Sequence, residues 1–165
     1  MYTDEQKRIY LEVALEEARV ADRDGNYPIG SLVVDGSGEI LAKAHNECTS
    51  GSDVSAHAEI LCIRMLKDRV NKDTHGELTL FSSLEPCFGC SFFLARTNIK
   101  TVISALKDPH KGGMSMLQNN PDCSALLKHI TVINEPFEDL KTQSLELMKN
   151  YFLKLNRHDA AKYYE

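Results

Sequence analysis

Two short motifs contain residue types that bind metal ions and move protons. Cys87 and Cys90 stand three positions apart after Pro86, and His57 stands two positions before Glu59. Cysteine thiolate and histidine imidazole are common Zn²⁺ ligands, and cysteines at positions i and i+3 share one face of a helix. We therefore expect His57, Cys87 and Cys90 to hold one Zn²⁺ per chain.

This ligand set indicates a catalytic zinc site. Three protein ligands leave the fourth tetrahedral position of zinc open for water. Zinc lowers the pKa of water to roughly 7 in well-studied enzymes, but two thiolates weaken this effect, so a nearby carboxylate has to help. Glu59 is placed to accept the water proton and to return it to a ring nitrogen and a departing amine. The predicted reaction is hydrolysis of an amidine, with Glu59 as the catalytic group.

Each motif alone has a second interpretation. A Cys-x-x-Cys pair in an α/β protein is also typical of a thioredoxin-like redox site, and a His-x-Glu pair is often only a solvated helix start. The redox hypothesis leaves the His-x-Glu motif unexplained. The stretch between His57 and Cys87 has room for one helix and one strand, and the two motifs together match the signature of zinc-dependent nucleobase deaminases.

Hydrophobic periodicity places both motifs in one α/β domain, residues 1–165. Helices are predicted from Thr3 to about Gly25, from Ala56 to about Arg69, from near Cys87, and from about Glu138 to His158. Strands are predicted over 29–34, 39–46, 78–82, 100–105 and 129–134. Because a helix joins the third and fourth strands, these two are expected to pair in parallel. The expected fold class is a three-layer α-β-α domain with a mixed sheet of about five strands.

Composition and charge restrict the class of protein. The 165 residues contain no apolar run that approaches the roughly 20 residues of a membrane span. The five cysteines are an odd number and the first residues lack the pattern of a secretory signal, so a cytoplasmic location is expected. A net charge of −5 disfavours a surface devoted to phosphate binding, although it permits a local basic patch.

The stretch from Pro28 to Asp108 resembles the cytidine and deoxycytidylate deaminase superfamily, in its branch of tRNA adenosine, guanine and cytosine deaminases. The two motifs, the Pro-Ile-Gly run that begins at Pro28 and the Leu-Glu-Pro run before Cys87 carry the resemblance. It implies a nucleobase-containing substrate, and a homodimer as in most relatives. It also implies substrate contacts by Ile29 in the pocket wall, Asn46 on the base or ribose, backbone groups of Ala58 and Leu84, Glu85, and Asp108.

The residues leave the identity of the substrate open. Asp108 and the C-terminal Tyr151 and Phe152 resemble features of the tRNA-editing members, but these two rings could equally pack the last helix. Acidic residues near the last helix would repel the phosphates of tRNA. Lysines after the fourth predicted strand and along the last helix form either one basic rim or scattered solvated charges.

We favour conversion of adenosine to inosine at the wobble position of tRNA. Deamination of a free base or nucleoside in salvage metabolism is the alternative hypothesis. A third hypothesis is a catalytically silent zinc-binding subunit, and the presence of Glu59 argues against it.

Overall fold

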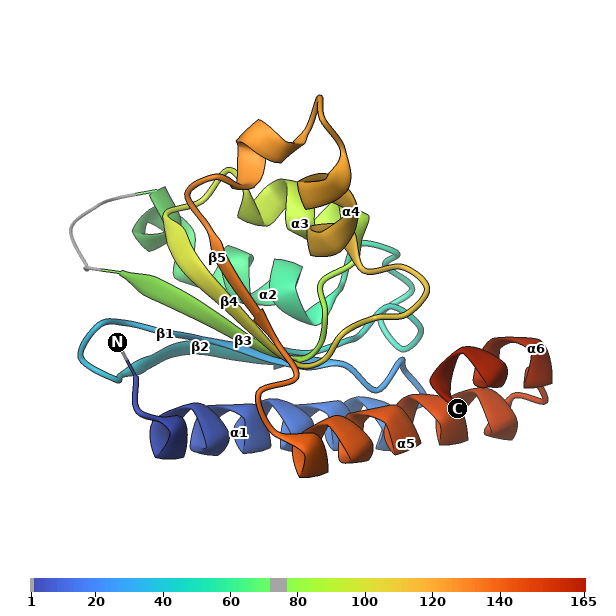
Figure 1. Ribbon diagram of the computed structural model, residues 1–165. Helices are drawn as coiled ribbons and strands as arrows, with labels where there is room; N and C mark the ends of the chain where they lie inside the picture. The colour runs from blue at the N-terminus through green and yellow to red at the C-terminus, as the bar shows by residue number, and fades with distance from the viewer. Residues whose placement is uncertain (1, 72–76) are drawn as a thin grey trace.

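The computed structural model describes residues 2–71 and 77–165, which form a five-stranded sheet between two layers of helices (Figure 1). The strands lie in the order β2-β1-β3-β4-β5. β1 pairs antiparallel with β2 and β3, whereas β4 pairs parallel with β3 and β5. The strands are β1 (Gly30–Val34), β2 (Ile40–His45), β3 (Leu78–Leu84), β4 (Ile99–Leu106) and β5 (Thr131–Asn134). The mixed sheet and the parallel β3–β4 pair are therefore confirmed.

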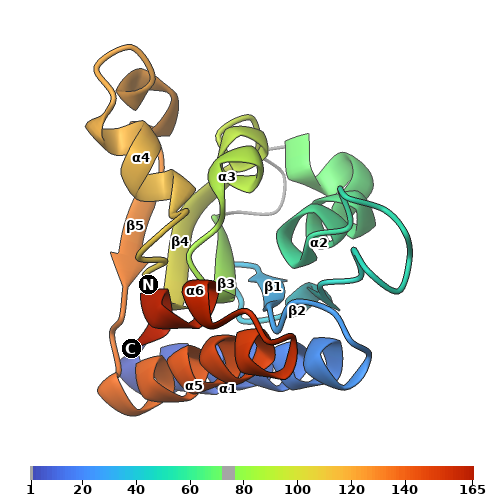
Figure 2. The ribbon, with the colours of Figure 1, turned by 90° about the vertical axis from the view of Figure 1, so that its right-hand side faces the viewer.

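Helices cover both faces of the sheet and make the three predicted layers (Figure 2). One face carries α1 (Asp4–Arg23) and α5 (Glu138–Lys154), which lie side by side. The other face carries α2 (Ala58–Leu66), α3 (Phe88–Leu94) and α4 (Gly113–Asn119). Short 3₁₀ helices span Lys67–Asn71, Ser124–Leu127 and Lys162–Tyr164. Within the described residues, the helices are too short or too polar to cross a membrane.

The first helix follows directly from its sequence signals. The Thr3 side chain accepts a hydrogen bond from the Gln6 N–H, and the Gln6 side chain accepts one from the Thr3 N–H. This capping box satisfies two N–H groups at the start of α1, where the sequence predicts the helix to begin. At the other end, Gly25 adopts a φ of +78°, which ends the helix where it was predicted to end.

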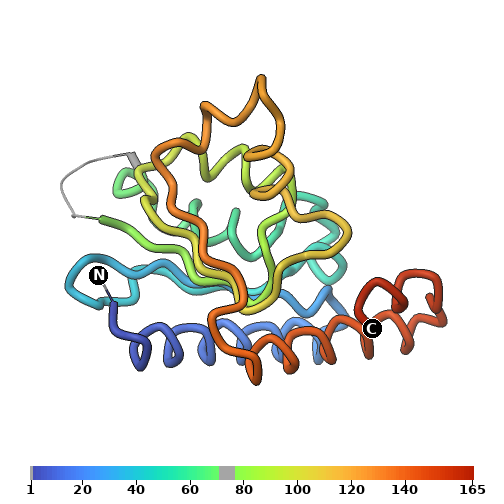
Figure 3. The backbone as a smooth tube through the Cα atoms, in the orientation of Figure 1, coloured from blue at the N-terminus to red at the C-terminus, as the bar shows by residue number. Residues whose placement is uncertain are grey.

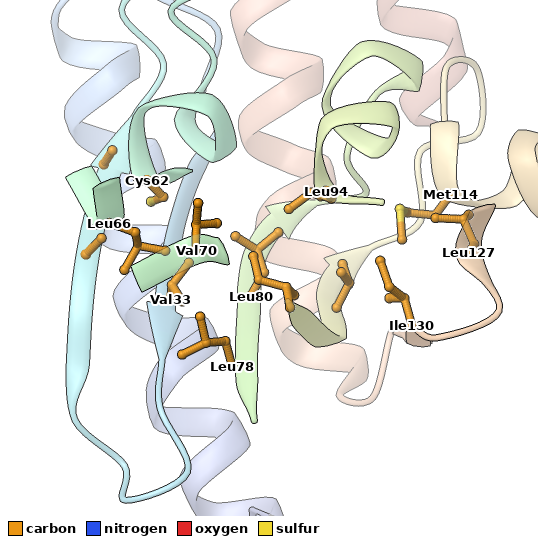
Figure 4. Close-up of a cluster of buried hydrophobic side chains, with 14 of the residues drawn as sticks. Val33, Cys62, Leu66, Val70, Leu78, Leu80, Leu94, Met114, Leu127 and Ile130 are labelled. Carbon is orange, nitrogen blue, oxygen red and sulfur yellow. The ribbon is translucent and has the colours of Figure 1, made fainter. Parts of the chain in front are cut away.

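A hydrophobic core joins the sheet to the helices that carry the metal motifs (Figure 4). Val33 and Leu80 point from the sheet toward Cys62 of α2 and Leu94 of α3. A second cluster on the opposite face includes Leu11, Leu15, Phe81, Ile103 and Leu140 and holds α1 and α5. Burial of these side chains fixes α2 and α3 against the same sheet, and so fixes their first residues relative to each other.

The last third of the chain differs from the prediction in two places. α5 ends at Lys154 and does not reach His158, because Asn156 adopts a left-handed φ of +55°. The chain then turns back and forms α6 (His158–Ala161) beside the end of α5 (Figure 3). α4 also lies outside the predicted helices, because the cap and first residue of this helix are both glycines.

Gly30 lets β1 lie directly against α1, because a Cβ atom there would come within 2.5 Å of backbone atoms of Ala14 and Ala18. We expect Gly30→Ala to lower the free energy of unfolding by about 1–3 kcal/mol, since crowding of this kind forces the backbone to move. Urea denaturation followed by circular dichroism measures the loss. Gly36→Ala is the matched control, because a Cβ atom there would be 4.0 Å from its nearest neighbour. Equal unfolding free energies for the two variants would contradict the close packing.

Candidate metal centre and active site

The three predicted ligands lie at the starts of two helices. His57 is the N-cap of α2, Cys87 is the N-cap of α3, and Cys90 lies in the first turn of α3. The Cys87 sulfur lies 3.6 Å from His57 Nδ1 and 3.6 Å from the Cys90 sulfur, and the Cys90 sulfur lies 3.4 Å from His57 Nδ1. The structure therefore brings together three donor atoms that are distant in the sequence.

This cluster has the spacing that a zinc ion requires. Zn–S bonds of about 2.3 Å and a Zn–N bond of about 2.0 Å at tetrahedral angles place neighbouring donors about 3.5–3.8 Å apart. The observed separations of 3.4–3.6 Å lie within about 0.2 Å of these values. In the part of the chain that the structure describes, no other three His, Cys, Asp or Glu side chains bring their ligand atoms within 4.8 Å of one another.

The thiols interact strongly with each other and with His57. Hydrogen bonds from Cys90 and His57 lower the pKa of the Cys87 thiol to about 4, although burial opposes this shift. The pKa of Cys90 is raised, because it shares a proton with the Cys87 sulfur and is buried. Two sulfurs that compete for one proton form a site in which a divalent cation can replace that proton and stabilise both thiolates.

Glu59 lies beside the metal cluster, where solvent hardly reaches it. The residue is 3% exposed, and one carboxylate oxygen lies 3.5 Å from the Cys90 sulfur. Burial raises the pKa of Glu59 to about 7, and the charge of the neighbouring Cys87 acts in the same direction. A carboxyl group with this pKa can both accept and donate a proton near neutral pH.

The cluster opens into a cavity of about 540 Å³. Most residues that the sequence singles out line it: Ile29, Asn46, His57, Glu59, Leu84, Glu85, Cys87 and Asp108. Two others lie elsewhere. Cys90 is buried and is not among the lining residues. The Ala58 side chain is fully buried, so only its backbone can face a ligand.

The hydrogen bonds of Asn46 restrict what this residue can offer to a ligand. Its Oδ1 accepts a hydrogen bond of 3.1 Å from the Cys48 N–H. Among the described residues, its Nδ2 has only a long 3.5 Å contact, with the Cys48 sulfur. Because the carbonyl oxygen is occupied within its own loop, Asn46 presents mainly an N–H donor to the cavity.

Asp108 shapes the loop that follows β4. Its Oδ1 accepts hydrogen bonds from the backbone N–H groups of His110 and Lys111, at 2.9 and 3.1 Å. The Tyr164 hydroxyl lies 3.5 Å from the same oxygen. The carboxylate therefore links this loop to the C-terminal end of the chain, in addition to lining the cavity.

The C-terminal segment forms a cavity wall, of which the sequence singled out Phe152 but not Tyr163 and Tyr164. Phe152, Arg157, Tyr163 and Tyr164 line the cavity, together with Tyr27 from the segment before β1. The Tyr163 ring stacks on His110 with ring centroids 4.0 Å apart. The break in the helix at Asn156 brings α6 back toward the cavity, and no short-range pattern in the sequence marks this break.

The basic residues near the fourth strand and the last helix do not form one continuous basic rim. His110, Lys111 and Arg157 line the cavity, but Arg157 pairs with Asp159, Lys154 pairs with Asp22, and Lys149 pairs with Glu165. The cationic part of the rim is therefore smaller than a single rim built from every predicted lysine. Tyr151 is 6% exposed and packs against Tyr27, which confirms a packing role for this ring.

Comparisons with known proteins match this chain to deaminases. Residues 4–106 match the family model for the cytidine and deoxycytidylate deaminase zinc-binding region. The tRNA-specific adenosine deaminase of Aquifex aeolicus is 34% identical over 152 residues, which cover 92% of this chain and 97% of that protein. A solved structure from a study of A-to-I editing by tRNA A34 deaminases is 27% identical, with a TM-score of 0.70 over 85% of this chain and 99% of that one.

Guanine deaminase from Nitrosomonas europaea has a similar fold. Its structure gives a TM-score of 0.72 at 20% sequence identity, covering 86% of this chain and 82% of that chain. At this level of identity the likeness concerns the fold alone. The same three-layer scaffold is therefore found in a protein named for a free base.

Cys87→Ala tests the metal cluster. We expect the variant to lose stoichiometric zinc and to unfold at a lower temperature, because metal binding energy contributes to folding energy. Elemental analysis of the purified protein and thermal denaturation measure the two effects. Cys123→Ala is the matched control, because Cys123 is a free cysteine outside the cluster. Retention of one zinc per chain by Cys87→Ala would exclude this ligand set.

Proposed function

The chain belongs to the cytidine and deoxycytidylate deaminase zinc-binding family and is a hydrolytic deaminase, and we propose that it converts adenosine to inosine at the wobble position of tRNA. The observation that carries this proposal is the identity of 34% along 97% of a tRNA-specific adenosine deaminase. A match over this length includes the C-terminal half, where part of the cavity wall arises. It therefore supports a similar substrate as well as similar chemistry.

His57, Cys87 and Cys90 would hold the zinc ion, which their 3.4–3.6 Å separations fit. When bound, zinc supplies a Lewis acid that makes a water molecule nucleophilic at neutral pH. The three side chains also orient one another, because each contacts the other two. His57 and Cys87 line the cavity, so they present the metal position to a ligand.

Glu59 would move the protons of the reaction. The buried carboxylate accepts a proton from the attacking water and gives it to the ring nitrogen next to the amino-bearing carbon. It then assists transfer of a proton to the departing amine, so that ammonia leaves and a carbonyl remains. A pKa of about 7 suits both directions of transfer, because neither form of the carboxyl is strongly favoured near neutral pH.

Other cavity residues would position the substrate. Asn46 offers an N–H donor, which suits a ring nitrogen or a ribose oxygen. Ile29 and Leu84 give the cavity an apolar lining near the cluster, and the backbone N–H of Ala58 lies at the start of α2. These roles are proposals that rest on where the side chains lie.

The cavity rim supports a polynucleotide substrate. Lys111 can approach a phosphate, and the exposed rings of Tyr27 and Tyr163 offer faces on which unpaired bases can stack. A base in a single-stranded anticodon loop can enter such a cavity without a large cost for unpairing. These features support tRNA over a free base, for which the outer rim would have no use.

We also propose that residues 1–165 act as one cytoplasmic deaminase domain and assemble as a homodimer. Phe88, Phe93 and Met116 are each at least half exposed on α3 and α4. Exposed apolar side chains of this size on neighbouring helices support an interface with a second copy.

Glu59→Gln isolates the proton transfer step. We expect the variant to keep its zinc and to lose about 10²–10⁴-fold in kcat, because the amide cannot accept a proton. Ammonia release and elemental analysis on the same sample measure both properties. Glu47→Gln is the matched control, since Glu47 is exposed and lies outside the cavity lining. A Glu59→Gln variant with near wild-type turnover would exclude Glu59 as the proton carrier.

A substrate panel tests the choice of substrate. We expect the zinc-loaded protein to deaminate an anticodon stem-loop that carries adenosine at the wobble position, and to leave free adenine, guanine, cytosine and their nucleosides unchanged. Added salt is expected to weaken turnover of the stem-loop, because phosphate contacts are screened. Turnover of a free base or nucleoside, with no turnover of the stem-loop, would instead assign the protein to salvage metabolism.

A further inference from the structure

Glu85 connects the end of β3 to the start of α4. Its backbone N–H donates a 2.8 Å hydrogen bond to the Leu106 carbonyl, which extends the β3–β4 pairing by one residue. Its side chain is buried, with the residue 2% exposed. The carboxylate Oε1 accepts a 2.8 Å hydrogen bond from the backbone N–H of Ser115, the third residue of α4.

The carboxylate of Glu85 takes the place of a helix cap. Gly112 is the N-cap of α4 and has no side chain that can accept a hydrogen bond from the first turn. A Cβ atom on Gly112 would lie within 2.6 Å of the Glu85 carboxyl group. The glycine and the buried glutamate therefore depend on each other, because the space that a capping side chain would need belongs to Glu85.

The first turn of α4 also contacts the backbone of Cys87 directly. The Gly113 N–H donates a 2.8 Å hydrogen bond to the Pro86 carbonyl, and Gly112 forms an isolated antiparallel bridge with Cys87. A Cβ atom on Gly113 would lie within 2.4 Å of backbone atoms of Cys87 and Phe88. If α4 moves, the backbone of Cys87 has to move with it, because the two backbones are in direct contact.

We propose that Glu85 is a positioning residue for the metal site, which holds the start of α4 and through it the backbone of Cys87. The proposal rests on the ligand set of the proposed function. It extends that function by assigning a role to Glu85. Within the described residues, the Glu85 side chain forms no hydrogen bond with His57, Cys87 or Cys90. Partners that orient metal ligands in this indirect way commonly alter metal affinity when they are changed.

A direct contact with substrate is the competing role for Glu85. The residue lines the cavity, and its Oε2 is buried without a hydrogen-bond partner among the described residues. The two roles predict different kinetics. A substrate contact alters KM, whereas a positioning role alters zinc retention and kcat.

Three substitutions at Glu85 separate length from charge. Glu85→Gln keeps the length and the carbonyl oxygen that Ser115 needs, but removes the charge. Glu85→Asp keeps the charge but is one methylene too short to reach the Ser115 N–H. Glu85→Ala removes both. The rate at which zinc passes to a chromogenic chelator is measured without substrate, together with kcat and KM for deamination.

We expect Glu85→Asp and Glu85→Ala to release zinc about 10–100-fold faster than wild type, with a lower kcat and a KM within about twofold. Glu85→Gln is expected to release zinc at close to the wild-type rate. Wild-type zinc release by the Asp and Ala variants would overturn the proposal. So would a raised KM with unchanged kcat and zinc release in all three, because that pattern belongs to a substrate contact.

Changes on the Ser115 side test the same hydrogen bond if Glu85→Ala fails to fold. Ser115→Pro removes the N–H donor in the first helical turn, where proline is tolerated, and is expected to accelerate zinc release like Glu85→Asp. Ser115→Ala keeps the N–H and serves as the control. Adding Glu85→Asp to Ser115→Pro is expected to cause no further acceleration, and additive effects would contradict a shared hydrogen bond. Zinc release is measured without substrate, so these results do not depend on which substrate the protein deaminates.

Discussion

Three donor atoms on two different helices have to lie within about 4 Å of one another before a zinc ion can bind, and the architecture follows from this constraint. β3 ends at Leu84, three positions before Cys87, and the core beneath α2 and α3 holds both helices on one sheet. Neither helix is stabilised by a capping side chain at its first residue, because His57 and Cys87 occupy the two N-cap positions. Packing therefore replaces local capping at the metal site.

Glu59 adds a second constraint, because a carboxylate has to be kept in a place that disfavours its charge. Desolvation makes the charged carboxylate costly and the charge of Cys87 adds to this cost, whereas a backbone hydrogen bond, His57 and a hydrogen bond with Cys90 offset part of it. The same burial gives the carboxyl a pKa suited to proton transfer. Stability and reactivity are thus opposed at this residue, and the stability is supplied by the two hydrophobic clusters on either side of the sheet.

Local signals in the sequence predicted the layers, the mixed sheet and the members of the metal cluster. The capping box at Thr3 and the alternation in the strands are short-range patterns, and short-range patterns can be read without coordinates. The left-handed Asn156 and the glycine start of α4 have no such pattern. The aromatic cavity wall and the contact between Glu85 and Ser115 depend on tertiary packing, which spacing alone does not show. The contacts assigned to Asn46 and Ala58 stay predictions.

The cavity is built from two stretches of chain: one supplies the reacting groups, and the other supplies much of the entrance. All three metal ligands and Glu59 lie within residues 4–106, which match the family model, whereas residues 107–165 lie beyond it and supply half of the lining residues. Substitutions or insertions after β4 can therefore reshape the entrance while the reacting groups stay where they are. A scaffold divided in this way can acquire new substrates by changing its last sixty or so residues, and comparisons restricted to the zinc motifs will group together enzymes whose substrates differ.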